Sequence, residues 1–460
     1  MEFLILAIFV LGYVFIALEH NVKIDKAASA LITGTVCWGL FVTGTHEVPA
    51  HLAEDFSLFK ADFIGDASLA LHTFFEHRLL HHMEEIASIL FFLLGAMTIV
   101  ELVDAHEGFA VITDRIRTTK KVTLIWILAL LTFFFSAVLD NLTTSIVMVS
   151  LLRKLIDDKE TRWLFAGIVV VAANAGGAWS PIGDVTTTML WIGHQLTTGV
   201  IVSHLFIPSL VCLLVPLAIL TFTLKGEVKR PLVDDEHGHD PTTPAERKIV
   251  FTLGVLGLLF VPVFKTVTHL PPFMGMMLSL GVMWVVTEIL HRSKNQTQRA
   301  NLSVLSVLRK IDTASVLFFL GILLAVASLQ EIGHLIAAAG WLRDTMGNVY
   351  AINVTIGFLS AIVDNVPLVA ASMGMYDITP EAAMATASDW DKFFVQDGRF
   401  WQFLAYCAGT GGSALIIGSA AGVAVMGLEK IDFVWYIRKI SLLAIAGYLA
   451  GAGTYWLMFA

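Results

Sequence analysis

Long apolar stretches, separated by short polar segments, run along nearly the whole chain. A helix that spans a bilayer needs about 20 consecutive, predominantly apolar residues. Stretches close to that length cover residues 1–18, 27–44, 86–103, 201–224, 249–267, 273–290 and 433–458. The more polar segment 45–82 is expected to be helical and to lie at the membrane interface. The pattern therefore predicts an all-α, polytopic membrane protein.

One further apolar region, residues 122–155, has a polar centre that runs from Asp140 to Thr144. The region is too short for two full spans joined by an ordinary loop. Irregular backbone at membrane depth is tolerated only where protein or water lines it. We therefore predict a re-entrant helical hairpin over 122–155, with its tip at Asp140.

A second region, residues 161–198, is interrupted near its middle by Gly176, Gly177, Pro181 and Gly183. Proline removes a helical hydrogen bond, and glycine lowers helix stability. The polar groups that surround these residues are typical of a transmembrane helix that is unwound at the bilayer midplane. We predict a broken helix over 161–198.

Both irregular patterns recur in the second half of the chain. Residues 136–141 read SAVLDN, and residues 360–365 read SAIVDN, 224 positions later. Residues 408–419 align through their glycines with 173–184. These matches occur in the same order, which indicates an internal duplication. It predicts a second hairpin at 350–376, a second broken helix at 400–427 and a last span at 433–458.

The charges of the two connections indicate how the repeats are oriented. Four basic residues follow the first hairpin, namely Arg153, Lys154, Lys159 and Arg162. The matching connection, 377–399, has two basic residues against five acids. Since an excess of lysine and arginine marks the cytoplasmic side, the connections are expected on opposite faces. The repeats are therefore predicted to be inverted, with a site between the hairpins near the midplane.

The same reading divides the chain into a first repeat with its N-terminal spans (1–224), a cytoplasmic linker (225–248) and a second repeat (249–460). The linker contains a run of aspartate, glutamate and histidine at 234–240. Such a run can bind a metal weakly, but we interpret it as a solvated linker.

Composition agrees with a membrane protein and excludes several other classes. The 460 residues are 57% hydrophobic and 15% charged, with a mean hydropathy of +0.78. A net charge of -9 without a basic stripe argues against nucleic acid as a partner. Cys37, Cys212 and Cys407 lie far apart in apolar surroundings and are expected in the core. The apolar N-terminus has no basic leader, which favours direct insertion into a bacterial inner membrane.

Oxygen atoms dominate the polar groups at the four interruptions. The set comprises Asp140, Asn141, Thr143, Asn174, Asp184, Thr186, Thr187, Ser360, Asp364, Asn365, Thr410, Ser413 and Ser419. Oxygen ligands suit hard cations. Three ionised aspartates would attract sodium or lithium and repel citrate, succinate or sulfate. Protons and the metal ion are expected to compete for the same carboxylate, and such competition is sufficient for exchange.

Other interpretations of these residues stay open. Asp140 and Asp364 could be helix caps, and Asn174 with the Thr186–Thr187 pair could be packing groups between helices. Glu101 could either reach the interface or take part in proton passage. At the level of the protein, the rivals are a sodium-coupled dicarboxylate or oxyanion transporter of the same fold and an intramembrane hydrolase with Asp140 and Asp364 as its dyad.

The motifs at 136–144, 174–187 and 360–365 resemble the NhaD family of bacterial sodium/proton antiporters, in the ion transporter superfamily. The resemblance implies that Na⁺ or Li⁺ leaves as protons enter, with no cofactor. It also implies two hairpins, a transport domain that moves on a scaffold, and a homodimer. By motif, the functional residues would be Asp140, Asn141, Asn174, Asp184, Thr186, Thr187, Ser360, Asp364, Asn365 and Ser413, with Glu101 as a candidate proton path.

This chain departs from the dicarboxylate branch of that superfamily, which has serine, asparagine and threonine at its hairpin tips. Here the tips are Asp140-Asn141 and Asp364-Asn365. The two broken segments also differ from each other, because Ser419 stands where the first has Asp184. The first repeat is therefore expected to supply the more anionic side of the site.

Overall fold

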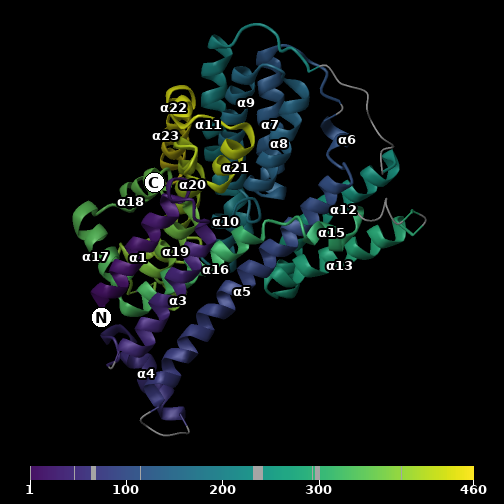
Figure 1. The fold of residues 1–460 in the computed structure, drawn as a ribbon. Coiled ribbons are helices and arrows are strands. Elements are labelled where there is room, and N and C mark those ends of the chain that lie inside the picture. The colour runs from purple at the N-terminus through teal and green to yellow at the C-terminus, as the bar shows by residue number, and fades with distance from the viewer. Residues whose placement is uncertain are drawn as a thin grey trace. The chain divides into compact units, whose positions relative to one another are not determined.

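The computed structural model describes residues 2–45, 47–63, 69–113, 115–231, 242–292, 294–295, 301–384 and 386–460. Figure 1 shows that these segments form a helical fold. Within them, eight helices are long and apolar enough to cross a membrane. The predicted all-α, polytopic membrane protein is confirmed at this level. The histidine-containing run at 234–240 lies outside the described residues.

The chain forms two compact units. Unit 1 comprises Met1–Leu90, Asp312–Val349 and Val366–Ile378, and unit 2 comprises Phe91–Ile311, Tyr350–Asn365 and Thr379–Ala460. Each unit therefore combines segments from both halves of the sequence. Every residue proposed for the ion site lies in unit 2.

Unit 1 is organised around the packing of α3 against α1 and α16. Gly34 and Gly321 face the backbone of the opposite helix so closely that a Cβ atom at either position would clash. Small residues allow this close approach of membrane helices. The elements of unit 1 are α1 (Glu2–Ala17), α2 (Glu19–Val22), α3 (Lys26–Gly44), η1 (Ala50–Leu52), α4 (Ala53–Asp62), the first part of α5 (Ala70–Ala105), α16 (Thr313–Ile332), α17 (His334–Met346) and most of α19 (Asn365–Met375).

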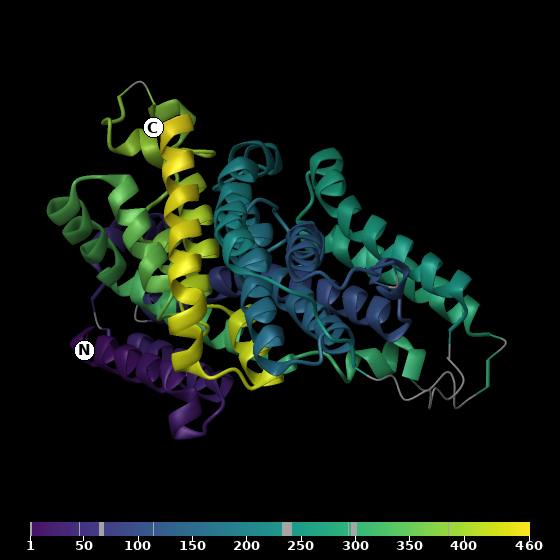
Figure 2. The same cartoon turned by 90° about the horizontal axis from the view of Figure 1, so that it is seen from above.

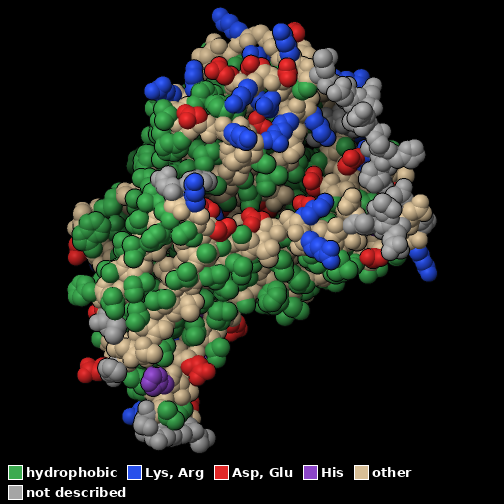
Figure 3. All heavy atoms as spheres, viewed as in Figure 1, with side chains coloured by type: hydrophobic (Ala, Val, Ile, Leu, Met, Phe, Trp, Pro, Cys, Tyr) green, Lys and Arg blue, Asp and Glu red, His purple; other side chains and the backbone are tan. Residues whose placement is uncertain are grey.

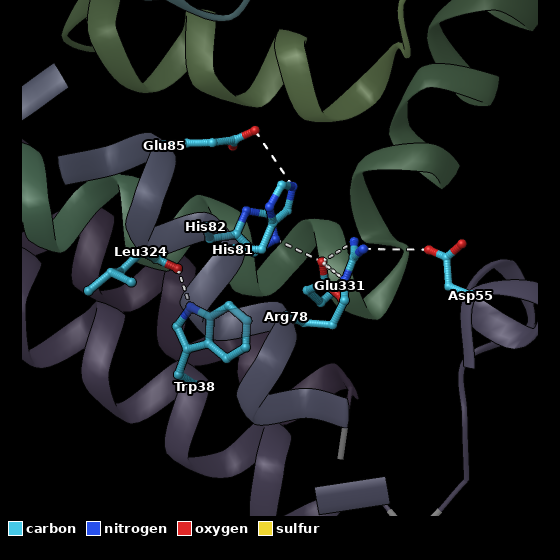
Figure 4. Close-up of polar contacts among 8 residues, drawn as sticks. All are labelled: Trp38, Asp55, Arg78, His81, His82, Glu85, Leu324 and Glu331. Carbon is cyan, nitrogen blue, oxygen red and sulfur yellow. Dashed lines mark hydrogen bonds and ion pairs between the residues drawn. The ribbon is translucent and has the colours of Figure 1, made fainter. Parts of the chain in front are cut away.

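The helix α5 is longer than the sequence predicts. It runs for 36 residues from Ala70, although we expected a span over 86–103 and interfacial structure before it. Its polar side chains explain the difference (Figure 4). Arg78 donates to both carboxylate oxygens of buried Glu331 on α16, at 2.7–3.0 Å, and His82 Nε2 lies 2.7 Å from the same carboxylate. A buried charge is tolerated when it is paired and hydrogen-bonded.

Unit 2 contains the remaining helices, and α7, α8 and α9 pack against one another in it. The last helix, α23, lies along α11 (Figure 2). The elements are α6 (Ala110–Thr113), α7 (Lys121–Leu139), α8 (Asn141–Leu155), α9 (Lys159–Gly177), α10 (Val185–Ile192), α11 (Thr198–Thr223), α12 (Pro244–Thr268), α13 (Pro272–Leu290), α15 (Val304–Leu308), α18 (Val349–Ser360), η2 (Glu381–Ala383), η3 (Asp391–Phe394), α20 (Arg399–Gly411), η4 (Gly412–Ala414), α21 (Ala420–Glu429), α22 (Phe433–Tyr436), the π-helical turn η5 (Ile437–Ser441) and α23 (Leu442–Phe459).

Basic side chains gather at one end of unit 2, where α9 and α22 begin (Figure 3). Exposed members of this group are Lys154, Lys159, Lys430, Arg438 and Lys439. Apolar side chains cover the surface beside it in Figure 3. The distribution is the one expected for the cytoplasmic end of a membrane protein.

At the same end, a buried acid joins α21 to the first half of the chain. The carboxylate of Glu429, at the end of α21, accepts hydrogen bonds from Arg153 Nε and Arg162 Nε, each at 2.6 Å. Trp163 Nε1 donates to the backbone oxygen of Glu429 at 3.0 Å. Because Glu429 is only 5% exposed, this clamp satisfies a charge that would otherwise be costly to bury.

Candidate ion-binding site

Helix ends converge at the positions where the sequence predicts interruptions. Asp140 is the single residue between α7 and α8, and residues 178–184 separate α9 from α10. In the second half, α20 ends at Gly411, the short η4 follows, and α21 begins at Ala420. A helix N-terminus leaves backbone N–H groups without helical partners. The breaks therefore require side chains that cap these helix ends in the interior of unit 2.

Asp184 is the centre of the site and is 1% exposed. Its Oδ1 accepts hydrogen bonds from the backbone N and the Oγ1 of Thr186, both at 2.8 Å, and so caps α10. Its Oδ2 accepts from Asn141 Nδ2 at 2.5 Å and from Asn365 Nδ2 at 3.5 Å. One oxygen thus has the structural role of a cap, while the other faces the amides of the two predicted hairpin tips.

Asn174, on α9, connects the first half of the site to the second. Its Oδ1 accepts from Asn141 Nδ2 at 3.1 Å. Its Nδ2 donates to Ser413 Oγ at 2.9 Å and to Ser419 Oγ at 3.0 Å. Ser419 in turn caps α21, because its Oγ accepts from Gly422 N at 3.2 Å. Asn174 is fully buried, so these bonds fix its amide in place.

Asp140 has an unusual backbone conformation, with φ 74° and ψ 160°. This region is essentially restricted to glycine and costs on the order of 1–3 kcal/mol for other residues. Its carboxylate caps α8, because Oδ1 accepts from Thr143 N and Oδ2 from Thr143 Oγ1, both at 2.8 Å. The charges of Asp140 and Asp364 both act electrostatically on Asp184. All three predicted carboxylates therefore interact in one region.

Other predicted site residues donate their hydroxyl hydrogens to the backbone. Thr187 Oγ1 donates to Asp184 O at 2.9 Å, Ser360 Oγ to Ala408 O at 2.9 Å, and Thr410 Oγ1 to Tyr406 O at 2.6 Å. These bonds support the breaks and leave oxygen lone pairs as the groups that could reach an ion.

Glu101 lies near the C-terminal end of α5, where Asp104 and Lys310 act on it electrostatically. No hydrogen bond among the described residues joins Glu101 to Asp184 or to its partners. The structure thus brings aspartates, asparagines and serines together, and Glu101 is not among the residues hydrogen-bonded to them.

Three side chains near the breaks were not assigned a role from the sequence. Thr144 Oγ1 and Ser145 Oγ, in the first turn of α8, are buried and have no hydrogen-bond partner among the described residues. The motif that ends at Thr144 was the only signal for them. Trp179 packs against both Phe133 and Phe206, with ring centroids 5.7 and 5.0 Å away, which indicates a packing role.

The side chains around Asp184 carry amide and hydroxyl groups. The Asp184 carboxylate accepts hydrogen bonds from the side-chain amides of Asn141 and Asn365 and from the hydroxyl of Thr186. The described residues contain no group of three or more histidine, cysteine, aspartate or glutamate side chains that could hold a metal ion. The three cysteines, all buried, are free thiols far from one another in sequence.

Comparison with known proteins identifies the family. A family model described as "Citrate transporter" matches residues 4–393. Sodium/proton antiporter 2 of Arabidopsis thaliana is 44% identical and is covered over 97% of both chains. Sodium/proton antiporter 1 of the same plant is 52% identical over 82% of this chain, which spans 62% of that relative's length. The Na⁺/H⁺ antiporter NhaD of Vibrio parahaemolyticus is 31% identical, with 77% of this chain and 86% of the relative covered.

These relatives come from a plant and from bacteria, so they support a multi-pass membrane protein without singling out a bacterial inner membrane. They are transporters rather than enzymes, which confirms that part of the sequence-based prediction. Both the extent of the family match and the coverage of the relatives lead to the same assignment. The chain belongs to the citrate transporter family, in the ion transporter superfamily, as an NhaD-type antiporter.

Proposed function

We propose that this protein exchanges Na⁺ or Li⁺ from the cytoplasm for external protons by alternating access. The observation that carries the proposal is the buried Oδ2 of Asp184, which faces the amides of Asn141 and Asn365 while Asp140 and Asp364 add negative charge. The names of the relatives, sodium/proton antiporters from a plant and from bacteria, support the same ions.

Competition between the two cargoes follows from the chemistry of the Asp184–Asn141 contact. In the structure Asn141 donates its Nδ2–H to Oδ2 of Asp184. A sodium ion at Oδ2 is not bound by an N–H group, so Asn141 must turn its amide and present Oδ1. A proton on Oδ2 would donate to that same amide oxygen. We infer that cation and proton use the same rearrangement and exclude each other.

The architecture implied by the sequence is part of the proposal. We infer that α7–α8 and α18–α19 are re-entrant hairpins of two inverted repeats, with the site near the midplane. The basic end at Lys154 and Lys159 supports one cytoplasmic connection. Single cysteines at exposed Lys154 and exposed Asp389, in a chain without the three native cysteines, test the inversion. A membrane-impermeant maleimide should label them from opposite sides, and labelling from the same side would contradict it.

A homodimer is likewise proposed, on the strength of the family resemblance. Cross-linking in native membranes, together with the mass of the purified protein in detergent, measures the oligomeric state. A monomer in both measurements would contradict the dimer and would leave the exchange reaction unaffected.

The exchange itself can be measured with purified protein in proteoliposomes that contain a pH-sensitive dye. An imposed pH gradient should collapse when NaCl or LiCl is added to the wild-type protein. Asp140→Asn should reduce this response about 100-fold or more, because the amide keeps a cap acceptor and loses a negative charge that attracts the cation to the site. Asp389→Asn removes an exposed carboxylate from a connection and serves as the control. Equal responses from wild type and Asp140→Asn would exclude Asp140 as the coupling acid.

A second candidate is sodium-coupled uptake of citrate or a similar dicarboxylate, because the matching family model carries the description "Citrate transporter". Three interacting carboxylates argue against it, since such charges repel an anion strongly where water is scarce. Uptake of labelled citrate into the same proteoliposomes, driven by a sodium gradient, would overturn the antiport proposal if no proton flux accompanied it.

A further inference from the structure

The half-helix α10 ends at half-buried Ile192, directly after buried Trp191, and its last carbonyl groups need partners there. An unsatisfied carbonyl costs several kcal/mol in an apolar environment. Met189 O accepts from Gly193 N at 2.8 Å, and Leu190 O accepts from Leu196 N at 3.1 Å. Trp191 O receives its bond from a different helix, because Lys265 Nζ on α12 donates to it at 2.7 Å. A side-chain ammonium thus completes the end of α10.

Lys265 makes a second contact with the same residue. Its Nζ lies over the Trp191 ring, 4.5 Å from the centroid, in a cation–π arrangement. Trp191 is 2% exposed, and its ring contacts Phe92 edge-on with centroids 6.4 Å apart. No carboxylate of the described chain acts on Lys265. The lysine is therefore directed at the helix end rather than at an acid. A lysine within an apolar helix is costly, which makes a functional role for it a reasonable hypothesis.

The two ends of α10 carry opposite charges. Asp184 caps its N-terminus and Lys265 binds near its C-terminus, which is the favourable arrangement for the helix dipole. Eight residues at 1.5 Å each separate the ends by about 12 Å. Lys265 is thus too far from the ion site to be a ligand. Any influence on Asp184 must pass through the helix between them.

We propose that Lys265 is a positioning residue, which fixes the C-terminal end of α10 and thereby holds Asp184 at its place in the ion site. This inference rests on the proposed exchange of sodium for protons. A short helix attached at both ends moves as one rod, so loss of the Lys265 contact shifts the oxygen atoms at its other end. Binding sites require their ligands within about 0.5 Å of the productive geometry. The expected result is weaker sodium binding with an intact ligand set.

The test compares Lys265→Met, Lys265→Gln and Lys265→Arg, with Lys248→Met as the control for losing an exposed lysine from α12. Proteoliposomes with a measured amount of protein give KM for Na⁺ and the maximal rate per molecule. We expect Lys265→Met to raise KM fivefold or more, Lys265→Arg to stay within twofold of wild type, and Lys248→Met to match wild type. Lys265→Gln keeps a donor without the charge and is expected between Met and Arg.

A purely structural role would lower the yield of folded protein and leave KM of the surviving molecules unchanged. A wild-type KM in Lys265→Met would therefore overturn the inference. If Lys265→Met does not fold, the same criterion applies to Lys265→Gln. A wild-type protein that exchanges no sodium defeats the proposed function instead. In that case the rate of amide hydrogen exchange in residues 185–196 decides whether Lys265 holds α10. Equal protection of these amides in wild type and Lys265→Gln would show that the contact between Lys265 and Trp191 O does not hold the helix.

Discussion

The break between α9 and α10 and the break between α20 and α21 share their backbone contacts and differ in their charge. Ser136 Oγ donates to Ala173 O at 2.5 Å in the first, and Ser360 Oγ donates to Ala408 O at 2.9 Å in the second. The cap residues Asp184 and Ser419 have almost the same backbone angles, φ -148° and ψ 145° against φ -149° and ψ 153°. The same local geometry thus accommodates an acid or an alcohol.

This difference separates the shape of the break from its ion chemistry. Either side chain can cap a helix, because both supply an oxygen acceptor. Only Asp184 adds a charge, and its second oxygen faces Asn141 and Asn365. The second break contributes Ser413 and Ser419 as partners of Asn174. We infer that the first break carries the charge of the site, while the second completes its hydrogen bonding.

The largest expected effect comes from removing that charge. Asp184→Asn keeps an oxygen that can accept from Thr186 N, so the fold should survive, but sodium exchange should fall about 100-fold or more because a carboxylate is replaced by a neutral amide. Ser419→Ala should lower exchange less than tenfold, since it removes one partner of Asn174 and the cap of α21 but no charge. Sodium-dependent proton flux in proteoliposomes measures both. Equal losses would show that the two breaks contribute equally.

The next effect tests the geometry that the breaks share. A Cβ atom on Gly183 would lie 2.6 Å from Ser136 O, and one on Gly418 would lie 2.6 Å from Ser360 O. Gly183→Ala and Gly418→Ala should therefore each cost about 1–3 kcal/mol through overpacking. Melting temperatures of the detergent-solubilised protein should fall by a similar amount in both. Gly199→Ala, with no atom within 4 Å of the added Cβ, is the control. A loss in only one break would contradict the shared geometry.

The two hairpin tips differ in backbone conformation as well. Asp140 has a positive φ. Asp364 is not among the described non-glycine residues with a positive φ. Asp140→Gly should relieve strain and raise stability by about 1 kcal/mol, since glycine replaces a capping side chain at little cost. Asp364→Gly should lower stability by about 0.5–1 kcal/mol or more, because it adds freedom to the unfolded chain and relieves no positive φ. Thermal unfolding compares them, and shifts of the same sign would contradict the difference.

The smallest effect concerns the starts of α9 and α20, outside the spanning segments. Asp158 caps α9, whereas Gly398 precedes α20 without a side-chain cap. Hydrogen bonds from Thr161 hold the pKa of the Asp158 carboxyl below its usual range. A lowered folded-state pKa stabilises the protein above the unfolded-state pKa, and this stabilisation disappears as the pH falls through the folded-state pKa.

Asp158→Ala should therefore cost about 1 kcal/mol or less at pH 7. Its difference from wild type in melting temperature should shrink once the pH falls below about 4. Thermal unfolding at several pH values measures this. A difference that persists unchanged at the lowest pH would show that the carboxylate charge plays no part in the cap.

Local sequence patterns anticipated where several helices end. Helices α7 and α8 meet at Asp140, and α9 and α20 end at glycines within the predicted broken segments. Whether α7 and α8 form a re-entrant hairpin stays a prediction. Proline, glycine and clustered polar residues determine helix ends through the neighbouring backbone, so their signal is local. The orientation of the repeats stays a prediction.

Long-range pairs were beyond the reach of the sequence. The extension of α5 to Ala70 depends on Arg78 and His82 meeting Glu331, some 250 residues away. From the sequence, Lys265 looks like a residue at the boundary of an apolar helix. In the structure its ammonium donates to Trp191 O on another helix. Hydropathy registers the cost of such polar groups in an apolar stretch, but it carries no information about the partner that offsets the cost.

The clamp on Glu429 has a consequence for how the protein is made. Arg153 and Glu429 are 276 residues apart, so the ribosome completes α8 and α9 long before their acidic partner exists. At about 5–20 residues per second, the interval is roughly 15 to 55 s. During that time Arg153 and Arg162 must remain with water or lipid headgroups. The early helices therefore enter the membrane before the partner of their basic end exists, and docking of α21 is a late step of biogenesis.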